Sequence, residues 1–108
     1  MECLILKIPI IKEKHKRPES IREVLKESAN KFGDKIVYKY YTSANEIAEM
    51  TFKQLYTTYK NVGTSICSYG LKKKKIAIIA ENRPEWIIAY AAIISSGSIV
   101  IPLDKDLM

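Results

Sequence analysis

The stretch IAIIAENRPEWIIAYAAIISSGSIVIPLD, residues 76–104, decides the fold class of this 108-residue chain. Its first five residues are apolar on both faces of an extended backbone, which is typical of a strand buried in a parallel sheet. A polar break at Glu81–Arg83 precedes an apolar run that Pro84 opens and Gly97 ends, and this arrangement predicts a helix. A second β-branched run at 99–101 completes a βαβ unit, whose crossover is expected to be right-handed.

The same stretch excludes a simple membrane helix. Residues 86–103 carry no charge, but the serine- and glycine-rich segment Ser95–Ser98 interrupts them. A buried helix, a turn and a buried strand are therefore expected, with Trp86 in the core at the start of the helix. The apolar beginning of the chain carries Glu2 where a signal peptide has positive charge, which favours a cytoplasmic protein without a transmembrane segment.

Upstream of this unit, a capping box at Ser20–Glu23 predicts a helix over residues 20–32. Gly33 is expected to end the helix in the left-handed conformation. Alternating residues at 35–41, a turn at 42–45 and a returning run at 46–51 predict a β-hairpin. The helix over residues 20–32 is expected to bury one apolar face, formed by Ile21, Val24, Leu25, Ala29 and Phe32.

A second helix is predicted to start at the capping box of Thr51 and Gln54 and to end at Gly70. Leu71 is expected to fold back on Ile66 in a Schellman motif. Gly63 lies inside this helix at a cost of roughly 1 kcal/mol, which close packing against a neighbour is expected to offset. The apolar face comprises Phe52, Leu55, Tyr56, Tyr59, Val62 and Ile66.

Together these elements predict an α/β fold: an N-terminal helix and a β-hairpin, followed by a helix and the first βαβ unit of an incomplete parallel sheet. Residues 1–17 form a basic lead-in, and residues 18–108 form one partial domain. The net charge of +6 is concentrated in that lead-in and in Lys72–Lys75. Two short patches differ from the continuous basic stripe of nucleic-acid-binding proteins, so nucleic acid is not an expected partner.

Ligands of open α/β sheets bind beyond the carboxyl ends of the strands, so Glu81–Arg83 is a plausible edge of a site. The favoured interpretation is simpler: Asn82 caps the following helix and Arg83 is solvated. Asp104 follows the second strand, where a ribose partner could lie. However, the first turn contains no glycine to admit a pyrophosphate, which argues against dinucleotide binding.

The remaining reactive residues do not form a constellation. Ser95–Ser98 resembles a phosphate cradle only in composition, because it precedes a strand and lacks a lysine. The single histidine, His15, lies in a lysine-rich run. Cys3 and Cys67 are too few for a zinc site and are expected to be reduced. We therefore assign no catalytic, cofactor-binding or metal-binding residue from the sequence.

Residues 76–104 also resemble the N-terminal signature of the acyl-adenylate-forming (AMP-binding) superfamily. The elements that carry the resemblance are Asn82-x-Pro84-Glu85-Trp86, Gly97 and Pro102-Leu103-Asp104, together with the upstream segments ESANKFGDKIVYKY, EMTFKQLY and SYGLKKKKIAII. The resemblance covers roughly residues 18–107 and is greatest to bacterial long-chain fatty-acid–CoA ligases. Lys74-Lys75 and Phe52 depart from the usual pattern, in which Gly-Asp and Tyr are common.

The resemblance implies a two-step reaction in full-length members. A fatty carboxylate attacks the α-phosphate of ATP with the help of Mg²⁺, and the coenzyme A thiol then takes the acyl group and releases AMP. The phosphate loop, the adenine and magnesium motifs, the hinge and the C-terminal lysine of that family lie downstream of the matching segment. The resemblance therefore assigns no catalytic residue here.

The leading hypothesis is that the chain is an N-terminal fragment of an AMP-forming acyl-CoA synthetase, a scaffold that is inactive alone. Fatty acid, ATP and coenzyme A are then partners only in the full-length context, and a complementary downstream polypeptide is a possible partner. The alternatives are a stand-alone interaction or regulatory module and a small anion-binding α/β protein. Because the sheet stops after two strands, the isolated chain is expected to be unstable or to self-associate.

Overall fold

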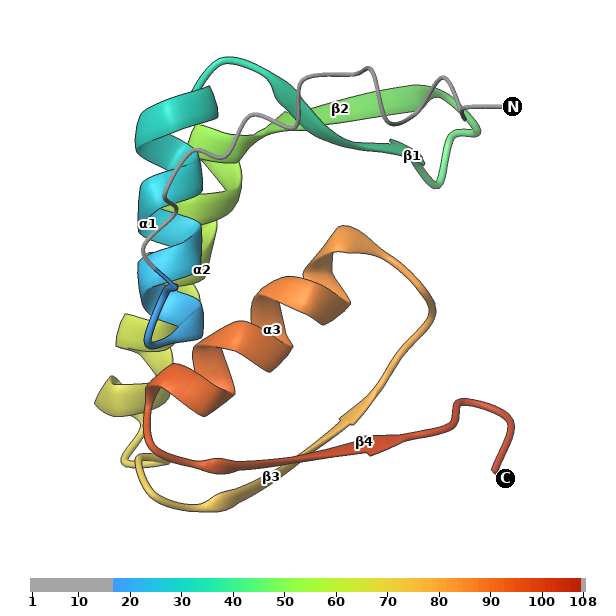
Figure 1. Cartoon of the computed structure of the whole chain (residues 1–108). Coiled ribbons are helices and arrows are strands. Elements are labelled where there is room, and N and C mark those ends of the chain that lie inside the picture. The colour runs from blue at the N-terminus through green and yellow to red at the C-terminus, as the bar shows by residue number, and fades with distance from the viewer. Residues whose placement is uncertain (1–16, 108) are drawn as a thin grey trace, which may run out of the picture.

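The computed structural model describes residues 17–107 and has three helices and two separate two-stranded sheets within them (Figure 1). An antiparallel hairpin follows the first helix, and a parallel pair of strands flanks the last helix. The predicted α/β element order is confirmed. In chain order the elements are α1 (Ile21–Phe32), β1 (Ile36–Tyr41), β2 (Ile47–Thr51), α2 (Phe52–Ser68), β3 (Lys75–Ile79), α3 (Pro84–Ser95) and β4 (Ile99–Leu103).

Helix α1 begins as predicted but differs in its details. The Ser20 hydroxyl accepts a hydrogen bond from the Glu23 amide at 3.1 Å, whereas the Glu23 carboxylate accepts one from Glu19 instead of Ser20. Gly33 has a φ of −17°, so the predicted left-handed ending is wrong. The buried face is narrower than expected, because Ile21 and Val24 are exposed.

The hairpin β1–β2 forms with the predicted turn, in which Asn45 adopts a positive φ of 60°. A bulge in β1 interrupts the register, since Ile36 pairs with Thr51 and Tyr38 already pairs with Met50. The bulge breaks the simple alternation expected from the sequence. Val37 consequently packs on the core beside Tyr38.

Helix α2 has both predicted ends. Thr51 and Gln54 make the complete capping box, and the Leu71 amide donates to the Ile66 carbonyl at 3.1 Å across Gly70. Gly70 has a φ of 68°, a conformation that glycine adopts without the strain of a side chain. The expected close packing at Gly63 is wrong. A Cβ there would meet no atom within 4 Å, so packing does not explain why the helix has a glycine at this position.

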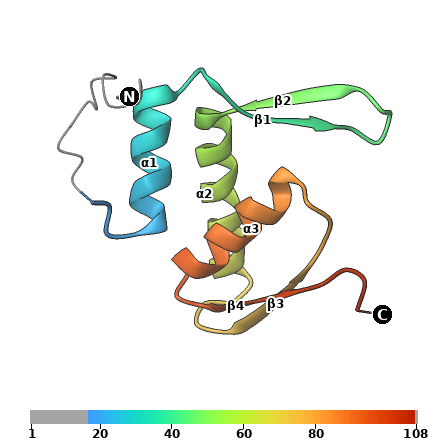
Figure 2. The same cartoon turned by 45° about the vertical axis from the view of Figure 1, so that its right-hand side comes forward.

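The core lies where α2 crosses α3. Leu55 and Tyr59 of α2 pack against Ile88, Ala91 and Ala92 of α3. The small alanines allow the two helices to approach closely, and α1 covers the other side of α2 (Figure 2). Side chains from α1, β1, β2 and α2 complete this cluster: Leu25, Val37, Tyr38, Met50, Tyr56, Val62 and Ile66.

Among the described residues, only one face of the parallel pair β3–β4 is covered. Ile78 is buried beneath α3, but Ile79 on the opposite face is 57% exposed. The expectation that these strands are buried on both faces is therefore wrong for this chain. Trp86 is also only half-buried and stacks on Tyr90 with ring centroids 5.2 Å apart, which corrects its predicted place in the core.

Candidate functional site

The carboxyl ends of β3 and β4 meet at one edge of the sheet, as the sequence predicts. A solvent-open hollow of about 350 Å³ lies there, lined by Ala80–Asn82, Trp86 and Pro102–Lys105. The Lys105 ammonium lies 3.9 Å from the Glu81 carboxylate and links the two loops. Asp104 accepts a hydrogen bond from the Asp106 amide at 2.9 Å. The carboxylates thus have partners from the chain itself, and they make the hollow unfavourable for phosphate.

Arg83, not Asn82, is the residue at the start of α3. Its backbone is extended at φ −134°, and no side chain caps the helix. The predicted Asn82 cap is therefore wrong, and Pro84 and Glu85 stabilise the first turn instead. Arg83 is not simply solvated either: its guanidinium donates two hydrogen bonds to the Glu85 carboxylate, at 3.2 and 3.4 Å.

This ion pair changes the titration of both partners. The hydrogen bonds from Arg83 lower the pKa of Glu85, and the Glu85 carboxylate raises the pKa of Arg83. Both groups are consequently charged over a wider pH range than free side chains. The pair holds the guanidinium carbon 6.0 Å from the centre of the Tyr40 ring. It thereby connects the loop after β3 to the hairpin.

A second hollow, of about 360 Å³, lies between the hairpin and the start of α3. Aromatic rings of Tyr38, Tyr40 and Trp86 form much of its wall, and Arg83 and Lys39 supply positive charge. Sequence reasoning missed this hollow, because it depends on how the distant hairpin lies against α3. The signal in the sequence is the aromatic alternation of β1, which indicates a strand but not the element that the strand faces.

The serine-rich turn after α3 is structural. The Ser98 hydroxyl donates to the Leu71 carbonyl at 2.9 Å and accepts from the Lys74 amide at 3.2 Å. The Ser96 hydroxyl is buried and donates to the Ile93 carbonyl at 2.7 Å. These bonds tie the turn to the loop before β3. They agree with the predicted turn and leave little capacity to hold a phosphate.

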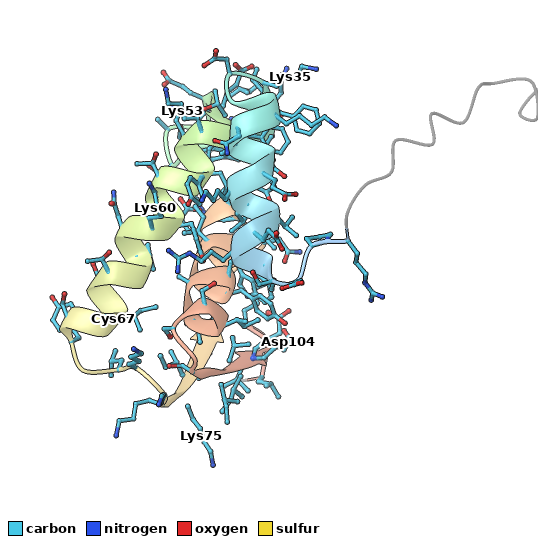
Figure 3. All side chains as sticks on the ribbon, turned by 60° about the vertical axis from the view of Figure 1, so that its left-hand side comes forward. Lys35, Lys53, Lys60, Cys67, Lys75 and Asp104 are labelled. Atoms are coloured by element: carbon cyan, nitrogen blue, oxygen red, sulfur yellow. The ribbon has the colours of Figure 1, made fainter. Side chains whose placement is uncertain are left out.

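Other predicted residues are separate from this edge. Cys67 is an exposed free thiol near the end of α2 (Figure 3), while Cys3 and His15 lie outside the described residues. Within residues 17–107, no three His, Cys, Asp or Glu side chains are grouped to hold a metal ion. No helix in that range is long and apolar enough to cross a membrane.

A third hollow, of about 380 Å³, opens beside Gly63 between the helices. Tyr59 and Ser95 line it, and their hydroxyls are joined by a hydrogen bond of 2.6 Å. Arg22 and Lys60 also line it and provide positive charge. Lys60 is engaged with the Tyr56 ring, 4.6 Å from its centre.

The family comparison agrees with this architecture. The family model described as "AMP-binding enzyme" matches residues 25–108, most of the chain. This chain belongs to the AMP-binding enzyme family. A curated relative, the 4-hydroxyphenylalkanoate adenylyltransferase of Mycobacterium marinum, is 27% identical over 88 residues. The match covers 78% of this chain but only 14% of that relative.

Solved structures show the same fold in other members of the AMP-binding enzyme family. The N-terminal subdomain of Klebsiella oxytoca NpsA has a TM-score of 0.72 and 18% identity, with 82% of this chain and 22% of that one covered. The fatty acid AMP ligase from Legionella pneumophila also has a TM-score of 0.72 and 18% identity. That match covers 91% of this chain and 17% of the ligase. The Bacillus subtilis O-succinylbenzoate CoA synthetase has a TM-score of 0.64 and 21% identity. That match covers 78% of this chain and 22% of the synthetase.

These matches establish the fold as that of the N-terminal part of adenylate-forming enzymes. The chain spans about a fifth or less of the length of each of these relatives. The names of these relatives give different substrates, and the relatives include both an AMP ligase and a coenzyme A synthetase.

Proposed function

We propose that this chain is the N-terminal scaffold of an AMP-forming enzyme that activates a fatty acid, and that it is inactive alone. The observation that carries the proposal is the family match over residues 25–108. The names of the Legionella and Mycobacterium relatives support a carboxylic acid as the substrate class. As the finer proposal, the complete enzyme transfers the acyl group to coenzyme A in the cytoplasm and releases AMP and pyrophosphate.

The described residues at the carboxyl ends of β3 and β4 do not fit ATP or Mg²⁺, so we derive no step through either. The hollow at the carboxyl ends of β3 and β4 contains Glu81 and Asp104, whose charge opposes phosphate. A magnesium ion needs several open oxygen ligands, whereas Glu81 already pairs with Lys105. In this proposal the segment supplies helices and strands on which further polypeptide builds the nucleotide site.

The first test is pyrophosphate release from ATP, Mg²⁺ and palmitate by purified residues 1–108. We expect no release above a blank without protein. Release above that blank, abolished by omitting palmitate, contradicts the scaffold proposal.

The second test asks whether the segment supports catalysis in a complete enzyme. Residues 17–107 replace the matching segment of the Legionella fatty acid AMP ligase, and palmitate-dependent exchange of pyrophosphate into ATP is measured. We expect activity above that of the same enzyme with the segment deleted. A graft that folds but matches the deletion contradicts the proposed role. The finer proposal, transfer of the acyl group to coenzyme A, is tested in a complete enzyme in which this segment is joined to its own downstream sequence. Mass spectrometry then shows whether the product is acyl-CoA or acyl-AMP.

A further inference from the structure

The third hollow, of about 380 Å³, is lined by residues from all three helices. Arg22 comes from α1, while Ala92 and Ser95 come from α3. Four of the lining residues on α2 are spaced i, i+3, i+4 and i+7 and therefore share one face of that helix: Lys60, Gly63, Thr64 and Cys67. Figure 3 shows Lys60 and Cys67 along α2. We refer to this space as the Gly63 hollow.

The open space beside Gly63 gives a reason for a glycine that packing does not explain. Glycine is unfavourable inside a helix. A Cβ at position 63 would meet no atom within 4 Å, so a larger side chain there would extend into the hollow. The glycine therefore keeps the hollow open, which a ligand site requires and helix packing does not.

The charges that line the Gly63 hollow are positive. Arg22 and Lys60 line it from two different helices, and within residues 17–107 no aspartate or glutamate lines it. The Lys60 ammonium lies 4.6 Å from the centre of the Tyr56 ring, a contact that restricts the side chain without neutralising its charge. Two cations without a lining carboxylate attract an anion into the hollow.

A hydroxyl pair adds a hydrogen-bond donor to the two cations. The Tyr59 and Ser95 hydroxyls are joined by a hydrogen bond of 2.6 Å, and Tyr59 is buried whereas Ser95 is exposed. Two hydroxyls that share one hydrogen bond use only one of their two hydrogens, so the pair has a donor left for a ligand. The Thr64 and Ser96 hydroxyls, in contrast, donate to backbone carbonyls of α2 and α3 at 2.9 and 2.7 Å.

The arrangement of these groups favours a phosphate over a carboxylate. A phosphate monoester carries nearly two negative charges at neutral pH and has three acceptor oxygens that point in different directions. A guanidinium, an ammonium and a hydroxyl from three helices can each bind one of these oxygens. A carboxylate has a single charge and only two oxygens in one plane. Ala92 and Gly63 provide an apolar wall for the organic part of an ester.

We propose that the Gly63 hollow binds a small molecule that carries a phosphate monoester, with Arg22, Lys60 and the Ser95 hydroxyl as its phosphate ligands. The hollow is separate from the edge where β3 and β4 end, because Ser95 is at the C-terminal end of α3 and that edge is at its N-terminal end. The proposal therefore does not depend on the proposed function.

The test measures binding of phenyl phosphate to residues 1–108 by saturation-transfer NMR at constant ionic strength. This measurement observes the ligand, so it is compatible with association of the chain. Benzoate and inorganic phosphate are compared as competitors. Arg22→Gln removes one cation of the hollow, and Gly63→Leu fills the space while keeping both cations. Lys26→Gln is the matched control, because Lys26 is exposed one turn further along α1 and does not line the hollow.

We expect Arg22→Gln to weaken phenyl phosphate binding by about tenfold, because one charge-assisted contact is lost. Gly63→Leu should abolish binding, and Lys26→Gln should leave it nearly unchanged. Equal effects of Arg22→Gln and Lys26→Gln overturn the proposal, since they indicate attraction to the surface charge alone. Undiminished binding by Gly63→Leu also overturns it. Benzoate or inorganic phosphate that competes as strongly as phenyl phosphate itself overturns the assignment to a phosphate monoester.

A second measurement needs no change in the hollow. In the Cys3→Ser chain, Cys67 is an exposed thiol in the wall of the hollow. We expect phenyl phosphate to slow its alkylation by iodoacetamide severalfold relative to chloride at the same ionic strength. Alkylation at an unchanged rate, followed by peptide mass analysis, overturns the proposal even if the variants fail to fold.

Discussion

The ring of Tyr59 is buried in the core, and its hydroxyl makes a hydrogen bond between two helices. It is 4% exposed, and its hydroxyl donates to the Ser95 hydroxyl at 2.6 Å, connecting α2 with α3. Replacing it by phenylalanine keeps the ring in the core but removes the donor. We expect Tyr59→Phe to lower the free energy of unfolding by about 1 kcal/mol in urea titrations. Tyr41→Phe is the control, because Tyr41 is 66% exposed. Equal effects of the two substitutions contradict the assigned role.

Glu85 gives a prediction for pH dependence. Arg83 lowers the pKa of Glu85 in the folded chain, so the unfolded chain binds a proton at higher pH than the folded one. The pair therefore stabilises the fold above the ordinary pKa of glutamate, and this contribution is lost as the pH falls through the lowered pKa. The effect is small because both side chains are largely solvent-accessible.

Glu85→Gln removes this titration. We expect a slightly lower Tm at pH 7 and a shallower loss of Tm between neutral and acidic pH. Glu49→Gln is the control, because Glu49 forms another exposed ion pair, with its carboxylate 3.5 Å from the Lys39 ammonium. A Tm difference between wild type and Glu85→Gln that grows toward acidic pH contradicts the assignment.

At the scale of elements, helix α2 has one glycine in its interior and another just after its C-terminal end, and the two form a matched pair. Gly63 is in the helix interior with open space where a Cβ would lie, whereas Gly70 has a φ of 68°. We expect Gly63→Ala to stabilise the chain by about 1 kcal/mol, because alanine favours the helix. Gly70→Ala should destabilise it by about 1–2 kcal/mol, because its Cβ is strained at positive φ. Urea titration checks both. If Gly63→Ala instead destabilises the chain, a neighbouring group packs against position 63, and the prediction is contradicted.

The elements also show how far the sequence alone can predict the structure. The Thr51–Gln54 capping box and the Gly70 ending depend on neighbouring residues and were correct. The bulge at Val37 was not foreseen, because it follows from packing the hairpin on a distant helix. The Asn82 cap was wrong for a related reason. Arg83 is held by Glu85 and the Tyr40 ring, and it occupies the cap position itself.

For the molecule as a whole, the sequence predicts that Glu81 and Asp104 lie together beyond the carboxyl ends of the strands, but it does not predict what surrounds them. Glu81 and Asp104 line one hollow, as the rule for open α/β sheets predicts. The aromatic hollow beside it requires Tyr40 and Trp86, which are far apart in the chain. Trp86 was expected in the core because its neighbours are apolar. Apolar neighbours predict burial only where a complete domain supplies both covering layers.

That incomplete cover leads to the prediction for the isolated chain. Within residues 17–107, Ile79, Ile99 and Ile101 are exposed on the face of the β3–β4 sheet that points away from α3, and both sheets have open strand edges. An apolar patch beyond a few hundred Å² and unpaired edges favour association without a defined stoichiometry. Helix α3 is apolar on most of its surface, but α2 and the sheet cover much of it, so the exposed patch lies on the strands.

We therefore expect residues 1–108 to bind the dye ANS and to sediment as a heterogeneous, concentration-dependent mixture. Ile101→Lys should reduce both effects, because a charge in the middle of the sheet face that points away from α3 opposes apolar contact. Val24→Lys is the matched control, since Val24 on α1 is 42% exposed and Ile101 is 38% exposed. The contrary result is a monodisperse monomer with strongly protected amides at 76–80 and 99–101. The four strands and three helices of the described residues then suffice for a stable fold, and the chain acts as a self-sufficient module instead of a scaffold.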